Sequence, residues 1–275
     1  MRSGEEGFSA GLRDLFTSDY TDEHTVRSSP LRPAVPTRTT IHLDIQLIER
    51  PFGDPLVGPL LWREVSQVGA LKTAQRQSLR EAGFRVGHAS SSPPQILQRL
   101  LGMKSELMSD IDSYGSNKSA TRQVTLLSGS DAEIQTSAPY AKWNVSLERG
   151  GSVDLKGIKN ARCVFRIKAE ELQSGWARLQ FQPEIHHGRE TLRPVASASN
   201  WKLRTTQNVE PLFDQRFTLE LNRGELAVIT ADDTSAETIA GRFFLTGDDD
   251  NVASQRLLIV RLADIDHVKG VAVKK

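Results

Sequence analysis

The feature that most constrains this fold is an alternation of apolar and polar residues through the second half of the chain. Residues 163–167 read Cys-Val-Phe-Arg-Ile, and residues 217–221 read Phe-Thr-Leu-Glu-Leu. Because successive side chains of a strand point to opposite faces, this period of two predicts strands with one buried and one wet face. Such strands, separated by glycine-containing turns, predict an antiparallel sandwich or stacked sheets. The strands expected on this pattern lie at 124–126, 134–136, 143–147, 153–155, 163–167, 176–181, 201–203, 217–221, 226–229, 243–245 and 257–262. The turns expected between them include 149–151, 173–175, 187–188 and 223–224.

The segment before these strands mixes helical and strand periods. Residues 41–48 alternate apolar and polar side chains, which predicts a strand. Asp54 followed by Pro55 is typical of a helix start, since aspartate caps free N–H groups and proline lacks one. The apolar stripe of that helix would carry Leu61 and Val65. The other elements expected here are helices at 73–82 and 92–102 and a strand at 84–88.

We therefore predict an α+β fold, with a small N-terminal β-α-α-β-α unit followed by a β-rich, antiparallel, sandwich-like part. Pro30, Pro33 and Pro36 recur at the three-residue period of a polyproline II helix, which favours a spacer near the N-terminus. The expected boundaries are 1–40 for a flexible tail or linker, 41–102 for the small α/β unit, 103–120 for a loop, 121–268 for the β-rich domain and 269–275 for a tail.

Charge and cysteine content exclude several classes of protein. The 35 Lys and Arg residues offset 34 Asp and Glu residues, and this net charge of +1 argues against a strongly basic nucleic-acid binder. The single cysteine, Cys163, excludes an internal disulfide, and its apolar neighbours predict a buried, inert thiol. No stretch reaches the roughly 18–20 apolar residues of a membrane helix, and the charged N-terminal residues lack the pattern of a secretory signal. We expect no cofactor, because phosphate-loop, dinucleotide and zinc motifs are missing.

The pair His186-His187 is the most metal-like feature of the chain. Adjacent strand residues point to opposite faces, so the two imidazoles can rarely bind one ion together. Glu184 and His186 would share a face and could form a two-ligand site. The alternative prediction is that these are polar residues at the tip of a hairpin.

Two further patterns have a chemical interpretation and a plain one. Asp248, Asp249 and Asp250 form an oxygen-rich loop, but the regular acidic spacing and central glycine of a calcium loop are missing, which favours a solvated turn. Residues 7–11, Gly-Phe-Ser-Ala-Gly, match the Gly-x-Ser-x-Gly nucleophile elbow. No buried strand precedes them, so we predict neither a catalytic residue nor a metal site from these patterns.

Basic side chains follow one predicted strand and begin the next. They form either a face for an anionic partner or an ordinary solvated face. Two tryptophans add a surface for sugar or protein binding, with core packing as the alternative. The partner-binding candidates are therefore Arg162, Arg166, Lys168, Arg178, Trp176 and Trp201.

Several short patterns occur in the order found in bacterial secretins. Residues 175–185 resemble the G-x-x-L-x-V-x-P-x-I strand of that family, and residues 217–229 resemble its V-x-V-x-D-G-x-T-V-V-I hairpin. Residues 239–244 resemble the remains of the L-G-x-L-F lip, and residues 255–260 resemble the closing E-L-L-I-x-I strand. Upstream, residues 41–49 are similar to the strand that opens the secretin homology domain.

The secretin resemblance covers residues 41–262 and has two departures. The I-P lip is missing, and Thr230-Ala-Asp-Asp stands where the family has G-G-L, which argues against membrane insertion. Residues 61–62, 83–87 and 183–188 also resemble conserved planctomycete envelope-type proteins of unknown function. The resemblances imply a periplasmic, envelope-associated bacterial protein, and secretins imply a homo-oligomeric ring. The missing leader leaves a cytoplasmic location as the alternative.

These observations leave three hypotheses for the function. The first is a non-catalytic envelope protein that self-associates or binds protein partners through sheet edges and hairpins. The second is a hydrolase or lyase with a site near residues 184–187 and the loop 248–250, which requires these side chains to converge in one pocket. The third is a carbohydrate- or ligand-binding sandwich that exposes Trp176 or Trp201 on a flat face. We favour the first, with no enzymatic activity and no nucleic-acid partner.

Overall fold

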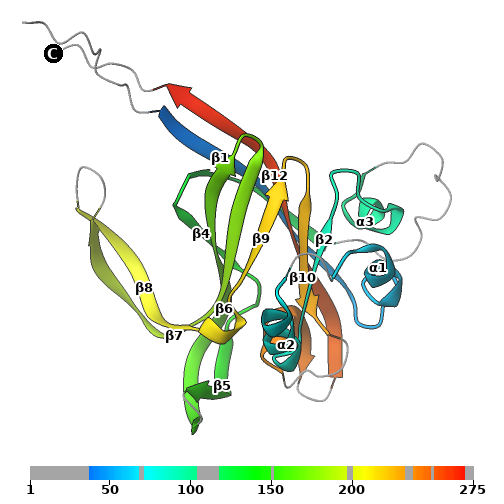
Figure 1. Ribbon diagram of the computed structural model, residues 1–275. Helices are drawn as coiled ribbons and strands as arrows, with labels where there is room; N and C mark the ends of the chain where they lie inside the picture. The colour runs from blue at the N-terminus through cyan, green and yellow to red at the C-terminus, as the bar shows by residue number, and fades with distance from the viewer. Residues whose placement is uncertain are drawn as a thin grey trace, which may run out of the picture.

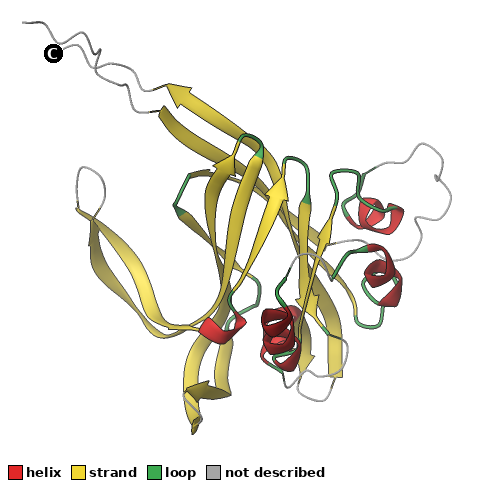
Figure 2. Cartoon of the chain, in the orientation of Figure 1, coloured by secondary structure: helices red, strands yellow, loops and turns green. Residues whose placement is uncertain are grey.

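The computed structural model describes residues 37–67, 71–103, 118–149, 152–196, 201–232, 238–248 and 251–269. Within these residues, two six-stranded sheets pack face to face around a common core, and helices lie beside them (Figure 1, Figure 2). The strands pair antiparallel within each sheet. The α+β, sandwich-like fold predicted from the sequence is confirmed.

The first sheet joins segments from the start and the end of the described chain. Its order is β2-β10-β12-β1-β3, with β11 paired to β12. The strands are β1 (Thr37–Pro51), β2 (Phe84–Ala89), β3 (Lys118–Leu127), β10 (Leu226–Ala231), β11 (Leu245–Asp248) and β12 (Asn251–Lys269). Both strands of the segment 41–102 therefore pair with strands near the C-terminus, β1 with β12 and β2 with β10. The domain boundaries given above stay a prediction.

The second sheet is arranged around β6 and β7, which pair with each other over most of their shared length. On its other side β7 pairs with β9 and, further along, with β8, whereas β6 pairs with β4 and β5. The strands are β4 (Asp131–Gln135), β5 (Tyr140–Arg149), β6 (Ser152–Gln173), β7 (Trp176–Ala196), β8 (Trp201–Pro211) and β9 (Phe217–Asn222). A short 3-10 turn, η1 (Phe213–Gln215), joins the last two.

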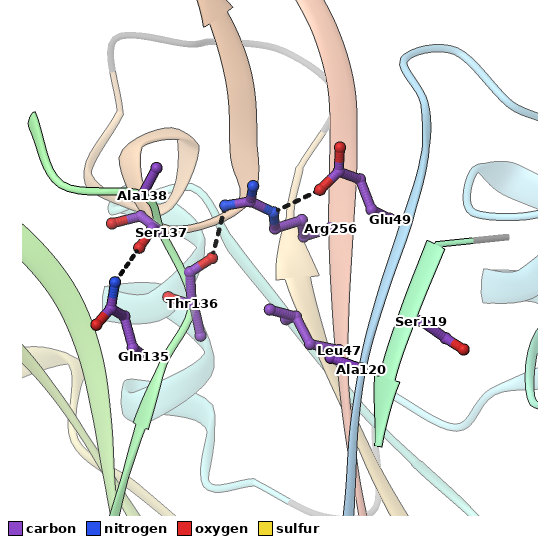
Figure 3. A pocket seen from close by; sticks show the side chains of 9 residues that line it. All are labelled: Leu47, Glu49, Ser119, Ala120, Gln135, Thr136, Ser137, Ala138 and Arg256. Carbon is purple, nitrogen blue, oxygen red and sulfur yellow. Dashed lines mark hydrogen bonds and ion pairs between the residues drawn. The ribbon is translucent and has the colours of Figure 1, made fainter. Parts of the chain in front are cut away.

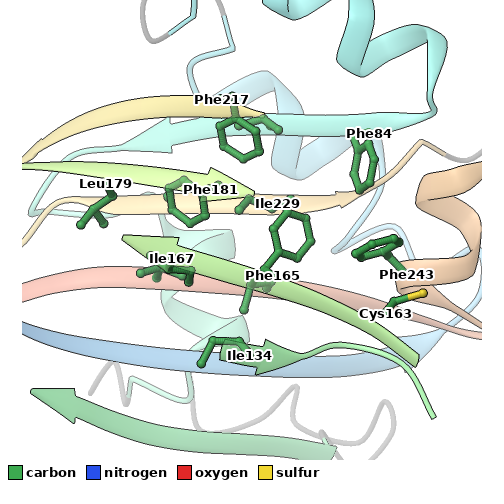
Figure 4. Packing of buried hydrophobic residues seen from close by; sticks show 14 of the residues in the cluster. Phe84, Ile134, Cys163, Phe165, Ile167, Leu179, Phe181, Phe217, Ile229 and Phe243 are labelled. Carbon is green, nitrogen blue, oxygen red and sulfur yellow. The ribbon is translucent and has the colours of Figure 1, made fainter. Parts of the chain in front are cut away.

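The core between the sheets is rich in phenylalanine. Phe165 of β6 and Phe84 of β2 face each other across the two sheets at a ring-centroid distance of 6.0 Å (Figure 4). Phe243 contacts both rings edge-on, at 5.3 Å from Phe165 and 5.5 Å from Phe84. Because aromatic rings bury a large area and pack edge-to-face favourably, this group of rings stabilises the packing of the two sheets against each other. Cys163 lies buried beside it, as predicted.

The short helices cover one outer face and one end of the sandwich. They are α1 (Pro59–Glu64), α2 (Thr73–Glu81), α3 (Gln95–Leu100) and α4 (Ile239–Phe244). Side chains of α1 and α3 form a second apolar cluster with the outer face of the first sheet, which includes Ile48, Val228 and Ile259. α2 and α4 contribute Leu79 and Phe243 to the core between the sheets.

The first helix starts later than its capping pattern predicts. Its first residue is Pro59, and Asp54 closes the preceding turn rather than capping the helix. The carboxylate of Asp54 accepts the N–H of Leu56 at 2.9 Å and the Nε–H of Arg50 at 2.6 Å. These local bonds use the carboxylate within the turn, so the prediction of a helix start at Pro55 is wrong.

The predicted strand at 243–245 is a helix for most of its length. Residues 239–244 form α4, and the side chain of Thr238 accepts the N–H of Gly241 at 3.0 Å at its N-cap. The apolar run Phe243-Phe244 inserts into the core from this helix. A short apolar run has no clear period, which is why the sequence pattern was compatible with a strand.

Two strands are longer than predicted, because the chain continues as a strand through segments where the sequence pattern predicted a break or a turn. β6 joins the predicted strands at 153–155 and 163–167 into one, and β7 runs through the predicted turn at 187–188. Gly188 has a φ of +82°, and the register between β7 and β8 shifts between His187 and Thr191. Glycine here makes a β-bulge instead of a turn, and the β7–β8 hairpin curves away from the sheet (Figure 1).

Candidate functional site

The outer face of the second sheet brings together most of the polar residues singled out in the sequence. In residues 161–169 of β6 and 177–185 of β7, the odd-numbered apolar residues, such as Phe165 and Ile185, lie in the core. The even-numbered residues of these two segments therefore lie on the outer face. The register places Arg162 opposite His186 and Val164 opposite Glu184. Glu184 and His186 share a face, as their spacing predicted.

Arg166 is the centre of an ion-pair network on this face. Its Nε donates to Oε1 of Glu184 at 2.8 Å, and its Nη2 donates to Oε2 of the same carboxylate at 3.1 Å. The guanidinium also contacts β4, at 2.7 Å from Asp131 Oδ2 and 3.2 Å from Glu133 Oε1. A bidentate guanidinium–carboxylate pair fixes both side chains, so the network ties β4, β6 and β7 together.

His186 completes the network on the other side of Glu184. Its Nε2 lies 2.9 Å from Glu184 Oε2, and only 4% and 5% of the two side chains are exposed. Burial alone would raise the pKa of Glu184, but the hydrogen bonds from His186 and Arg166 outweigh it and hold that pKa below its ordinary value. The bond to Glu184 raises the pKa of Arg166. The carboxylate is thus held in its charged form.

This arrangement favours a structural role for Glu184. Both carboxylate oxygens already accept hydrogen bonds or ion pairs from Arg166 and His186. A general base needs a free lone pair within reach of a substrate proton. Burial raises the pKa of the Cys163 thiol to about 12, so its thiolate is not available as a nucleophile near neutral pH.

His187 lies on the opposite face from His186, as expected for neighbouring strand residues. Its Nε2 is 3.5 Å from Oε1 of Glu210 on β8, and its side chain is buried. The prediction that these histidines lie at a hairpin tip is wrong, because β7 continues past them to Ala196. The bulge at Gly188 carries the strand onward where a turn was expected.

The acidic loop does not join this network in the described residues. Asp248 ends β11 in the other sheet, where it pairs with Asn251, whereas Asp249 and Asp250 lie outside the described residues. Among the described residues, no group of three or more His, Cys, Asp and Glu side chains could hold a metal ion. The Gly-x-Ser-x-Gly pattern at 7–11 also lies outside them. That the chain has no metal site stays a prediction.

The basic residues form part of a mixed-charge face. Arg166 is neutralised as described above, and Arg178 pairs with Glu220 of β9 at 3.0 Å. Arg162 donates to Gln135 at 3.4 Å, and Lys168 is exposed opposite Asp131. Acidic residues from β4, β7 and β9 thus alternate with basic ones, and the surface has less positive character than β6 alone indicates.

The tryptophans divide between the core and the surface. Trp62 and Trp143 are buried. Trp176 is half-buried at the start of β7, and the side chain of Trp201 lies outside the described residues. The partner-binding roles proposed for these side chains stay predictions.

A cavity of about 630 Å³ lies between the two sheets near their edge (Figure 3). Arg256 of β12 reaches across it, with Nε donating to Glu49 Oε2 at 3.0 Å and Nη1 donating to the Thr136 carbonyl at 2.9 Å. The sequence patterns gave no signal for this group, because Glu49 and Arg256 meet only through the register of β1 and β12. The cavity lining is Leu47, Glu49, Ser119, Ala120, Gln135, Thr136, Ser137, Ala138 and Arg256.

β3 forms an edge of the first sheet. It pairs with β1, and no strand among the described residues pairs with its other side. The Ser128 N–H donates to the Thr39 carbonyl at 2.9 Å in the same register. Because N–H and C=O groups alternate sides along an antiparallel strand, those of Thr121, Gln123 and Thr125 point away from β1. They form a row of backbone groups that another strand can pair with.

None of the helices in the described residues has the length and hydropathy to cross a membrane. Neither a protein-family model nor a curated protein matches the chain.

Solved secretin structures are similar to this chain at low TM-scores. The type II secretin GspD from enteropathogenic Escherichia coli is 11% identical with a TM-score of 0.24, over 84% of this chain and 69% of that one. The Vibrio cholerae type IV competence pilus secretin PilQ is 9% identical with a TM-score of 0.24, over 85% and 62%. The Pseudomonas aeruginosa type II secretin XcpQ is 18% identical with a TM-score of 0.21, over 85% and 57%. TM-scores of this size assign neither fold nor function, and the planctomycete resemblance stays a prediction.

Proposed function

We propose that this chain is a non-catalytic protein of the bacterial cell envelope that assembles with copies of itself by strand pairing at the edge of β3. The observation that carries the proposal is the row of outward N–H and C=O groups on this strand, unpaired among the described residues. The envelope location comes from the secretin resemblance of the sequence patterns. The ion-pair network on the other sheet supports a non-catalytic role, since the oxygens of Glu184 are already bonded.

The sequence of β3 suits this role. Its ten residues, Lys-Ser-Ala-Thr-Arg-Gln-Val-Thr-Leu-Leu, contain neither proline nor glycine. Proline, bulges and charged side chains are among the devices by which proteins protect an exposed edge, and of these β3 has two charges, Lys118 and Arg122, but no proline. The register of β1 with β3 is also free of shifts, so the edge is a regular template. The side chain of Leu127 adds exposed apolar surface, with 49% of it accessible.

Size-exclusion chromatography with light scattering on the full chain tests the proposal. We expect a mass of more than one chain, and a monomer for Gln123→Pro. Proline at position 123 removes an outward N–H while leaving the bonds between β3 and β1 in place. Gln123→Ala is the matched control and should keep the assembled mass, because it changes the side chain and leaves the backbone N–H.

Circular dichroism of the three proteins verifies that the proline variant folds. A monomeric wild type over the accessible concentration range would contradict self-association. An unchanged mass for a folded Gln123→Pro variant would place the contact elsewhere than β3 and contradict the edge-pairing mechanism.

A further inference from the structure

A second cavity, of about 240 Å³, lies between α2 and β2, away from both the ion-pair network and the β3 edge. Its floor is apolar, formed by Leu71, Leu79, Phe84 and Val86. The polar side chains that line it are Gln67, Arg76, Arg80, Arg85 and Asp232. Among the described residues of the lining, three guanidinium groups therefore face one carboxylate.

Arg85 is held in place on β2 by three neighbours. Its guanidinium carbon lies 4.6 Å from the centre of the Trp62 ring, and its Nε donates to Gln67 Oε1 at 3.4 Å. Its Nη1 lies 3.8 Å from Asp232 Oδ1, and the Trp62 ring is itself fixed by a 3.1 Å bond from Nε1 to the Val57 carbonyl. A guanidinium stacked on an indole loses little freedom when it binds a ligand.

Arg76 and Arg80 approach the cavity from α2. They are four positions apart in the sequence, which places them on one face of the helix, where like charges destabilise each other. Arg76 donates from Nη2 to Thr73 at 3.3 Å, whereas its Nε is buried and has no hydrogen-bond partner among the described residues. A buried donor without a partner is costly, and a bound anion would satisfy it.

We propose that this cavity, the three-arginine cavity, binds a small oxyanion. The planar forks of the arginines match a phosphate or carboxylate group, and the apolar floor strengthens the attraction by excluding water. The volume is below the roughly 300 Å³ at which drug-sized pockets begin, so the ligand is a small one. Three arginines against one aspartate in the lining favour a ligand with two negative charges. Inorganic pyrophosphate and succinate represent the phosphate and carboxylate classes.

Isothermal titration calorimetry of the full chain with each probe tests this inference, at constant ionic strength adjusted with NaCl. We expect saturable one-site binding of at least one probe, and the preferred probe identifies the class. Arg76→Gln and Arg80→Gln should each weaken binding at least tenfold. Arg63→Gln is the matched control, because Arg63 is exposed on α1 outside the cavity lining.

Three outcomes would overturn the inference. Neither probe binds saturably, or the double variant R76Q/R80Q binds the probe with the affinity of the wild type. The third is that Arg63→Gln weakens binding as much as Arg76→Gln and Arg80→Gln do. Circular dichroism must show that each variant is folded, and Arg80→Gln is the safer variant because Arg80 is exposed. The site does not depend on self-association, so Gln123→Pro should bind the probe as the wild type does. Failure of the anion site and failure of β3 pairing are therefore distinguishable.

Discussion

The outer faces of the two sheets are buried by different means. On the first sheet, α1 and α3 cover an apolar surface that includes Val228 and Ile259. On the second sheet, Glu184 and His186 are buried within a network of ion pairs centred on Arg166. One face gains stability from apolar area, and the other satisfies charges by pairing them.

This difference follows from the sequence patterns of the strands. All six residues of β10 are buried, because its apolar side chains face the core on one side and the helices on the other, while the hydroxyl of Thr230 donates to the Arg256 carbonyl at 2.6 Å. β6 and β7 alternate, so their second face is polar, and it can be buried only if each charge has partners. The comparison teaches that a polar strand face is not always a wet one.

The largest expected effect is at the core shared by both sheets. Phe165→Ala removes a fully buried ring that contacts Phe84 and Phe243, and should lower the free energy of unfolding by about 3–5 kcal/mol. Urea denaturation followed by circular dichroism measures this. A loss below about 1 kcal/mol would mean that the sheets are not packed through this ring.

A smaller loss is expected where α1 covers the first sheet. Leu61→Ala should cost about 2–5 kcal/mol, toward the lower end because the helix is short and can relax into the space. Leu60→Ala is the matched control on the same helix, since 41% of Leu60 is exposed, and it should change stability by less than about 0.5 kcal/mol. Equal losses for the two variants would break the contrast between covered and exposed residues.

The charged face should respond less to loss of a single partner. Glu184→Gln leaves Arg166 without its bidentate partner, but 35% of the Arg166 side chain is exposed and water can replace part of the interaction. We expect a loss of about 1–3 kcal/mol in the same urea assay. The control is Glu220→Gln at the exposed pair with Arg178, which should cost less than about 1 kcal/mol. A neutral Glu184→Gln would show that the network adds nothing to stability.

The smallest expected effect is a pH dependence of the difference in the free energy of unfolding between the wild type and Glu184→Gln. The pKa of Glu184 is below its ordinary value of 4.5 in the folded protein, so the folded state binds this proton less readily than the unfolded chain. Its contribution is therefore complete above about pH 4.5 and is lost as the pH falls through the lower folded-state pKa. The gap between wild type and Glu184→Gln should narrow in urea titrations between pH 6 and pH 3.5. A gap that widens as the pH falls would reverse the sign of the proposed shift.

Local periodicity was sufficient to predict part of the fold and of the site. The period of two placed Glu184 and His186 on one face and His187 on the other, and Gly83 ended the second helix as expected, with a φ of +81°. What local patterns cannot provide is register. Arg166 reaches Glu184 only because β6 and β7 pair with Val164 opposite Glu184.

Residues that can serve two structures were the other source of error. Phe243-Phe244 suits a strand or a helix equally, and the cap at Thr238 decides for a helix. Gly188 is compatible with a turn or a bulge. It forms a bulge because β7 pairs with β8 both before and after this residue. In both places the deciding interaction is made by a neighbouring segment. The three-arginine cavity has the same origin, since Arg85 comes from β2 and Arg76 from α2.

The most direct test of the central claim, pairing at the β3 edge, is hydrogen–deuterium exchange of the full chain at low and high protein concentration. The outward amides of β3, among residues 118–127, should exchange rapidly when the protein is dilute and become protected as the concentration rises. The buried strand β10 should be protected throughout. If the mass of the protein rises with concentration while β3 exchanges at an unchanged rate, then assembly uses another surface and the account is contradicted.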